Sequence, residues 1–144
     1  MTHSSIGLQR FIDAQQPTYE TALAEIRAGR KRTHWMWYVF PQVAGLGLSE
    51  TSRYFAITSL QEAREYLEHP LLGKRLIEIT SALLDQPDKN ARNIFGSPDD
   101  QKLHSSMTLF SLLPGADPVF RQVIDEYFNG INDERTVRLI VTSI

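Results

Sequence analysis

Apolar residues recur at helical spacing through most of this chain, and that pattern constrains the fold more than any other feature. Between residues 71 and 85, for example, Leu72, Leu76, Ile79 and Leu83 follow one another three or four positions apart, so one face of a helix would be apolar. No segment alternates apolar and polar residues between hairpin turns, as antiparallel strands do. The sequence therefore predicts an all-α fold.

Helix-start and helix-stop signals divide this pattern into six or seven helices. Ser59, followed three positions later by Glu62, forms a capping box that predicts a helix from 59 to about 68. Ser97, Pro98 and the two acids that follow form the strongest start signal. Serine is a favoured cap, proline suits the first helical position, and acids are favoured at the positive end of the helix dipole. We expect a single compact multihelical domain over residues 1–144.

Segment 34–42 is the exception to the helical pattern. It contains four aromatic side chains, namely Trp35, Trp37, Tyr38 and Phe40. So much aromatic surface must be covered on folding. Pro41 interrupts regular structure, and one candidate strand cannot make a sheet. We therefore predict an irregular or extended aromatic segment, in which Trp35 and Trp37 lie on the same side of the chain.

Composition excludes several classes of site. The chain has no cysteine, so disulfides, thiolate metal sites and cysteine nucleophiles are excluded. The four histidines include no H-x-x-x-H pair, and we predict no metal and no cofactor. A net charge of −2 disfavours a nucleic-acid partner, whose binding domains are usually strongly basic.

The sequence also carries signals about location. The N-terminus lacks the basic start and apolar run of a signal peptide. No apolar run approaches the roughly 20 residues that span a bilayer. We therefore expect a cytoplasmic protein without membrane contact, and the pattern specifies no oligomeric state.

Three consecutive basic residues, Arg30, Lys31 and Arg32, precede the aromatic segment. Arginine makes bidentate contacts to phosphate, and cations beside aromatic faces are typical of sites that hold a ring linked to phosphate. We predict Arg30, Arg32, Trp35 and Trp37 as ligand-binding residues. The alternatives are a solvated helix end for the basic residues and core packing for the tryptophans.

The candidate catalytic residues are His34, Asp100 and His104. Asp100 and His104 are four positions apart on a predicted helix and therefore neighbours on its surface. An aspartate that orients a histidine is half of many catalytic arrangements. Lys102 lies between them and is a further candidate ligand-binding residue. An ordinary helical pair, and a histidine that bonds at the edge of the core, would explain the same residues without catalysis.

Three motifs resemble those of a known family. They are RKRTHWMWYVFPQ at 30–42, YLEHPLLGKRL at 66–76 and IFGSPDDQKLHSSMTLF at 94–110. In this order they are similar to the bacterial family catalogued as Domain of Unknown Function 1810, whose members are sometimes mislabelled calpastatin. The resemblance covers almost the whole chain and implies a single, mostly helical domain. It implies no established activity, but its motifs contain both groups of candidate site residues.

The leading hypothesis is binding of a small anionic ligand, such as a nucleotide or an ADP-ribose-like compound, with hydrolysis as a further option. It requires segment 30–42 and the residues around Asp100 to meet at a hollow that water can reach. The alternative is a protein-interaction or regulatory module without catalytic activity, anchored by its aromatic segment. A third interpretation, single-stranded nucleic acid binding, would need a continuous positive groove. The sequence does not decide whether the protein is an enzyme.

Overall fold

Residues 3–143, which the computed structural model describes, form ten α-helices and no strand. In chain order the helices are α1 His3–Gln15, α2 Tyr19–Arg27, α3 Met36–Val39, α4 Glu50–Tyr54, α5 Leu60–Glu68, α6 Leu72–Leu84, α7 Ala91–Phe95, α8 Asp99–Ser111, α9 Val119–Tyr127 and α10 Glu134–Ser143. The all-α prediction is confirmed. Seven helices have nine or more residues, and the predicted number of six or seven is too low because α3, α4 and α7 are too short to show a periodic pattern.

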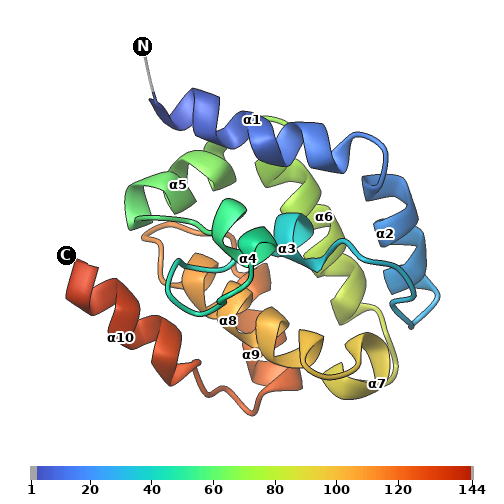
Figure 1. The fold of residues 1–144 in the computed structure, drawn as a ribbon. Helices are drawn as coiled ribbons and strands as arrows, with labels where there is room; N and C mark the ends of the chain where they lie inside the picture. Colours follow the sequence, from blue (N-terminus) through green and yellow to red (C-terminus); the bar gives the residue numbers. More distant parts are fainter. Residues whose placement is uncertain (1–2, 144) are drawn as a thin grey trace.

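Helix α8 lies at the centre of the molecule (Figure 1) and packs against α5, α7, α9 and α10. Between Leu103 and Phe110 every side chain except that of His104 is buried. A helix that is surrounded in this way does not need an amphipathic pattern. The small side chains of Ser105 and Ser106 fit this crowded position.

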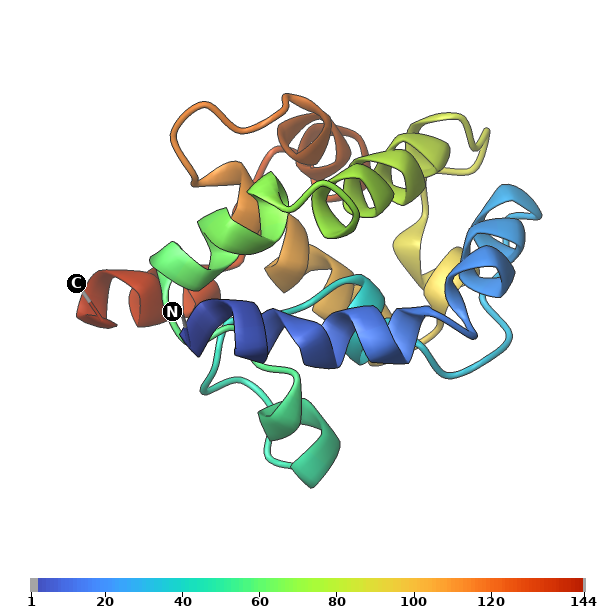
Figure 2. The ribbon, with the colours of Figure 1, turned by 90° about the horizontal axis from the view of Figure 1, so that it is seen from above.

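The other long helices surround α8. Helix α6 packs against α2, α5 and α9, and α1 packs against α3 and α5. A series of ring contacts crosses the core from Phe11 in α1 through Tyr66 and Phe110 to Phe120 in α9, with centroid distances of 5.0, 5.6 and 5.7 Å. The view from above places α10 at one edge of the molecule (Figure 2).

Helices α5 and α6 approach each other closely at Gly73. A Cβ atom at this position would lie 1.9 Å from the carbonyl oxygen of Leu67 in α5. Because backbone atoms cannot yield as a flexible side chain can, a residue with a Cβ atom does not fit there. Gly73 therefore has a packing role, although glycine lowers the helix propensity of α6.

The aromatic segment is not extended. Met36–Val39 forms one helical turn, α3, so the prediction of an irregular or extended segment at 34–42 is wrong for these four residues. The turn allows Trp35, Met36, Val39 and Phe40 all to be buried. In an extended chain alternate residues point to opposite sides, and these four could not all have faced the core.

The chain after α3 leaves the helical body and returns to it. At the base, Ala44 N donates to Ile57 O and Ile57 N donates to Gln42 O, both at 2.8 Å. Helix α4 lies within this excursion and has no buried residue. Figure 2 shows α4 projecting from the body, and we call residues 42–57 the projecting loop.

Helix α8 begins one residue later than predicted. Pro98 is the residue before the helix and makes no side-chain capping bond, and Ser97 lies in the connection from α7. Gly96, at φ +75°, follows the last residue of α7. Three residues, Gly96, Ser97 and Pro98, join the two helices, and Pro98 occupies the capping position that the sequence predicts for Ser97. The two predicted acids, Asp99 and Asp100, do lie in the first turn.

Candidate functional site

Glu25 in α2 fixes the course of the chain between α2 and α3. Its carboxylate accepts hydrogen bonds from Arg32 N at 2.8 Å, Thr33 N at 3.1 Å, Thr33 Oγ1 at 2.7 Å and Trp35 Nε1 at 2.9 Å. Burial by itself would raise the pKa of Glu25, but these hydrogen bonds outweigh burial and lower the pKa to about 2. A charged carboxylate therefore holds residues 32–35 in place.

Lys31 and Lys102 bring the basic segment and helix α8 together through one carboxylate. Asp99 forms ion pairs with Lys31 at 3.0 Å and with Lys102 at 3.3 Å. The side chain of Lys31 is only 7% exposed, and its Nζ lies 5.1 Å from the ring centroid of Trp35. The three charged groups together carry one positive charge.

Two further contacts join the aromatic segment to α8. Lys102 Nζ lies 5.1 Å from the ring centroid of Trp37, within cation–π range. Gln42 Nε2 donates to Ser105 Oγ, which in turn donates to Lys102 O at 3.1 Å. Segments about sixty positions apart in the sequence are therefore neighbours in the fold.

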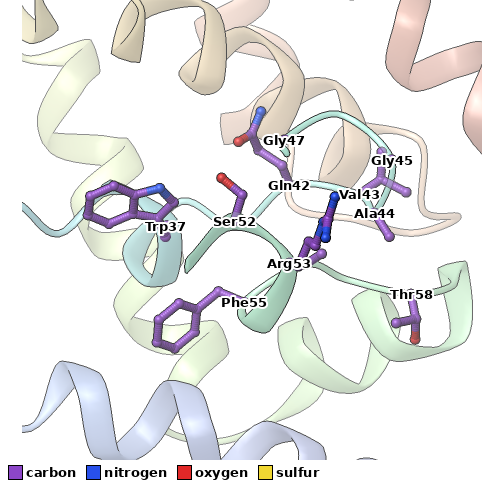
Figure 3. Close-up of a pocket in the computed structure, with 11 residues that line it drawn as sticks. Trp37, Gln42, Val43, Ala44, Gly45, Gly47, Ser52, Arg53, Phe55 and Thr58 are labelled. Atoms are coloured by element: carbon purple, nitrogen blue, oxygen red, sulfur yellow. The ribbon is translucent and has the colours of Figure 1, made fainter. Parts of the chain in front are cut away.

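Two hollows border the projecting loop, one between the loop and α8 and the other between the loop and Trp37 of α3. The first, which we call the charged hollow, has a volume of about 260 Å³ and is lined by Gln42, Leu46, Gly47, Ser52, Pro98, Gln101, Lys102, His104, Ser105, Asp133 and Arg135. The second, which we call the aromatic hollow, has a volume of about 110 Å³ (Figure 3) and is lined by Trp37, Gln42, Val43, Ala44, Gly45, Gly47, Ser52, Arg53, Phe55, Ala56 and Thr58. Gln42, Gly47 and Ser52 line both. We refer to the two together as the groove.

Positive side chains outnumber negative ones around the groove. Lys102, Arg135 and Arg53 line it, and the one carboxylate among the lining residues is that of Asp133. Asp133 Oδ2 already accepts hydrogen bonds from Thr136 N at 3.1 Å and Thr136 Oγ1 at 2.6 Å at the start of α10. Among the residues that the structure describes, Arg135 makes one hydrogen bond, a long one of 3.5 Å to Leu46 O. The groove thus concentrates positive charge in a chain whose net charge is −2.

The predicted ligand-binding residues are divided by the fold. Lys102 lines the charged hollow and Trp37, which is half-buried, lines the aromatic hollow. Arg30 and Arg32 are exposed and line neither. Trp35 is 1% exposed and donates to Glu25, so it has no face to offer a ligand and belongs to the core.

The candidate catalytic residues do not form one cluster. His34 is exposed and lines neither hollow. His104 does line the charged hollow, where its ring stacks on Phe128 at 4.1 Å and its Nε2 lies 2.6 Å from Ile131 O. A carbonyl only accepts, so Nε2 must donate. Asp100 Oδ1 accepts from Gln101 N at 2.9 Å. Catalytic roles for these residues stay predictions.

Sequence reasoning missed several groove residues. Arg53 and Arg135 are single basic residues in separate segments, and neither stands in a motif. Ser52 and Gln42 are likewise ordinary polar residues until the loop folds over α8. Ser105 is a poor helix former in the middle of α8, and it makes a polar contact with Gln42. In the part of the chain that the structure describes, no three His, Asp or Glu side chains are grouped as a metal ion would require.

Fold and groove define a class of protein: an all-α domain with a central buried helix and a positively charged groove beside a projecting loop. The family described as "Protein of unknown function (DUF1810)" matches residues 5–140. The chain belongs to this family, and the predicted resemblance is confirmed.

A solved structure has the same fold. It is the crystal structure of the conserved hypothetical protein Rv1873 from Mycobacterium tuberculosis, with 48% sequence identity and a TM-score of 0.91. The similarity covers 93% of this chain and 96% of that one. No curated protein matches the chain. Among the residues described, no helix is both long and apolar enough to cross a membrane.

Proposed function

We propose that this protein binds a small anionic ligand in the groove between α8 and the projecting loop. Nucleotides and ADP-ribose-like compounds belong to this class. The observation that carries the proposal is the set of three cations, Lys102, Arg135 and Arg53, around hollows lined by one carboxylate, while Asp99, which pairs with Lys102, is shared with Lys31. The lining carboxylate, Asp133, is engaged by its own helix.

The polar groups around the cations support the same proposal. Ser52, Gln101 and Ser105 line the charged hollow with hydroxyl or amide groups, which can donate to phosphate or carboxylate oxygens. Arginine and lysine then supply different contacts, a bidentate fork from Arg135 and a point charge from Lys102. A multiply charged oxyanion fits this combination better than a neutral ligand does.

The proposal is restricted to binding. Hydrolysis would use an acid–base pair, and the predicted pair makes other contacts: Asp100 accepts from Gln101 N, and His104 donates to Ile131 O. Lys102 and Arg135 in the charged hollow replace Arg30 and Arg32 as the proposed anion contacts.

A thermal-shift experiment tests the proposal with pyrophosphate as the probe. A ligand at 100 times its dissociation constant stabilises the folded state by about 2.7 kcal/mol, which raises Tm by several degrees in a domain of this size. We expect this rise for the wild-type chain and for Arg27→Gln, an exposed arginine on α2. In Arg135→Gln the rise should be lost or strongly reduced. Equal shifts in all three proteins would contradict the proposed site, and no shift in any would contradict anion binding.

The alternative of a protein-interaction module has one observation in its favour. Leu48 and Tyr54 on the projecting loop are 82% and 61% exposed. The aromatic segment that was expected to anchor a partner is unsuitable, since Trp35 and Phe40 are buried. If this alternative holds, Leu48→Ser with Tyr54→Ser would reduce self-association or partner binding in sedimentation experiments, and pyrophosphate would not stabilise the chain.

A further inference from the structure

We infer that the ligand of this groove carries a planar ring joined to its anionic group, and that the ring occupies the aromatic hollow beside Trp37. The ligand class is then a nucleoside phosphate or another aryl phosphate, and not a free oxyanion or a sugar phosphate. This inference rests on the proposed function, because it assigns the second half of the same groove.

The two hollows differ in chemistry and adjoin each other. Lys102 and Arg135 line only the charged hollow, whereas Trp37 and Phe55 line only the aromatic one. Aliphatic groups from Val43, Ala44 and Ala56 add to the apolar lining of the aromatic hollow. Gln42, Gly47 and Ser52 line both hollows, so the two lie side by side, and a ligand that occupies both would pass over these three residues.

The contact between Lys102 and Trp37 sets the distance between the two parts of the ligand. Lys102 Nζ lies 5.1 Å from the centroid of the Trp37 ring. An anionic group bound to Lys102 therefore has its next few atoms beside the indole. A ligand in which a ring is linked to phosphate by a short spacer matches this separation.

Trp37 differs from its buried neighbours in ways that favour a ligand contact. Trp35, two positions earlier, buries its indole and donates Nε1 to Glu25. Trp37 stays half-buried, and its indole N–H makes no hydrogen bond to any residue that the structure describes. Stacking on the indole face suits a planar ring, and the N–H, which points outward in the indole plane, is free to donate to a polar atom of the ligand outside the stacked ring.

Arg53 completes the aromatic hollow from the opposite side. Figure 3 places Trp37 and Phe55 on one side of this hollow and Arg53 on the other, with Ser52 between them. The guanidinium of Arg53 is exposed, and within the described residues it makes no ion pair. A guanidinium plane stacks on aromatic rings as well as pairing with phosphate, so Arg53 can contact either part of such a ligand.

Calorimetric titration with pyrophosphate, ribose 5-phosphate and ADP tests the inference. ADP should bind the wild-type chain about tenfold or more tightly than either probe without a base, as expected when a base stacks on an aromatic side chain. In Trp37→Leu this gain should disappear while pyrophosphate affinity stays within about twofold. The matched control is Tyr54→Leu, an exposed aromatic residue of the projecting loop that lines neither hollow, and it should keep the gain.

A fluorescence measurement on the wild-type chain makes the test independent of how Trp37→Leu folds. ADP should change the tryptophan emission, and pyrophosphate should change it much less, because Trp35 is buried and Trp37 is the indole beside the ring.

The outcomes separate the two proposals. Equal affinities for ADP and pyrophosphate, or an ADP gain that survives in Trp37→Leu, would overturn the ring site and leave the anion site standing. If none of the three probes binds, the proposed anion binding is contradicted, and the ring site that depends on it is contradicted as well.

Discussion

Glu25 shows most clearly how one residue supports the site. Its carboxylate accepts four hydrogen bonds from residues 32–35 and thereby fixes the chain that leads into α3. The pKa of Glu25 falls from an ordinary 4.5 to about 2 in the folded state. A depressed pKa means that the folded state favours the ionised form, so Glu25 stabilises the fold above about pH 4.5 by on the order of 3 kcal/mol.

This linkage predicts a specific loss of stability in acid. As pH falls from about 4.5 towards 2, the unfolded chain binds a proton that the folded chain does not, and the contribution of Glu25 disappears. Glu25→Gln keeps an oxygen for three of the donors but lacks the charge, so its free energy of unfolding should be lower by about 1–3 kcal/mol at pH 7 and should fall less between pH 5 and 3. Urea unfolding at both pH values measures this.

The matched control is Glu20→Gln, an exposed acid on the same helix. It should follow the wild-type dependence on pH. A Glu25→Gln variant with the same acid dependence as the wild type would show that the carboxylate does not act as described.

At the residue level the sequence could identify Lys102 and Trp37 but could not separate them from false candidates. Trp35 and Trp37 are the same residue type two positions apart, and only the turn of α3 decides that one is buried and the other lines the groove. Arg53 and Arg135 are 82 positions apart in the sequence. No local pattern could indicate that they border the same groove.

At the level of elements, local signals predicted the longer helices well. Ser59 Oγ accepts from Glu62 N at 3.1 Å, which is one half of the capping box, and the Glu62 carboxylate accepts from Thr58 N at 2.8 Å. Helix α5 ends at Glu68 as predicted. The short helices α3 and α4 were not predicted, because α3 is set by burial of its aromatic neighbours and α4 belongs to a loop with no buried residue of its own. Tertiary packing determines α3, whereas α4 begins at a local cap in which Ser49 Oγ accepts from Ser52 N at 3.0 Å.

At the contact between α5 and α6, a substitution of Gly73 should change stability in opposite directions through packing and through helix propensity. Gly73→Ala should raise the helix propensity of α6 by about 1 kcal/mol. The added methyl group would lie 1.9 Å from Leu67 O, and forced overpacking of this kind typically costs about 1–3 kcal/mol. We expect net destabilisation in a thermal or urea unfolding experiment.

Lys74→Ala changes the next residue of the same helix, which is exposed. Its stability should stay within about 0.5 kcal/mol of the wild type. Should Gly73→Ala prove as stable as this control or more so, the close approach of α5 and α6 at this point would be refuted.

At the level of the whole molecule, the fold joins two sequence motifs that the chain keeps far apart. The Lys31–Asp99–Lys102 ion pairs and the Gln42–Ser105 hydrogen bond bring segment 30–42 onto α8. The sequence indicated that these two segments matter, but the projecting loop and the start of α10 supply half of the groove without any motif. The position of the groove is therefore a property of the assembled helices.

The location of a bound anion tests this account most directly. In a titration of the ¹⁵N-labelled chain with pyrophosphate, followed by amide chemical shifts, we predict the largest changes at residues that line the charged hollow, namely Gly47, Ser52, Lys102, Ser105 and Arg135. Changes confined to Arg30, Arg32 and His34, or to the separate hollow between Leu113 and Asp117, with those groove amides unmoved, would contradict it.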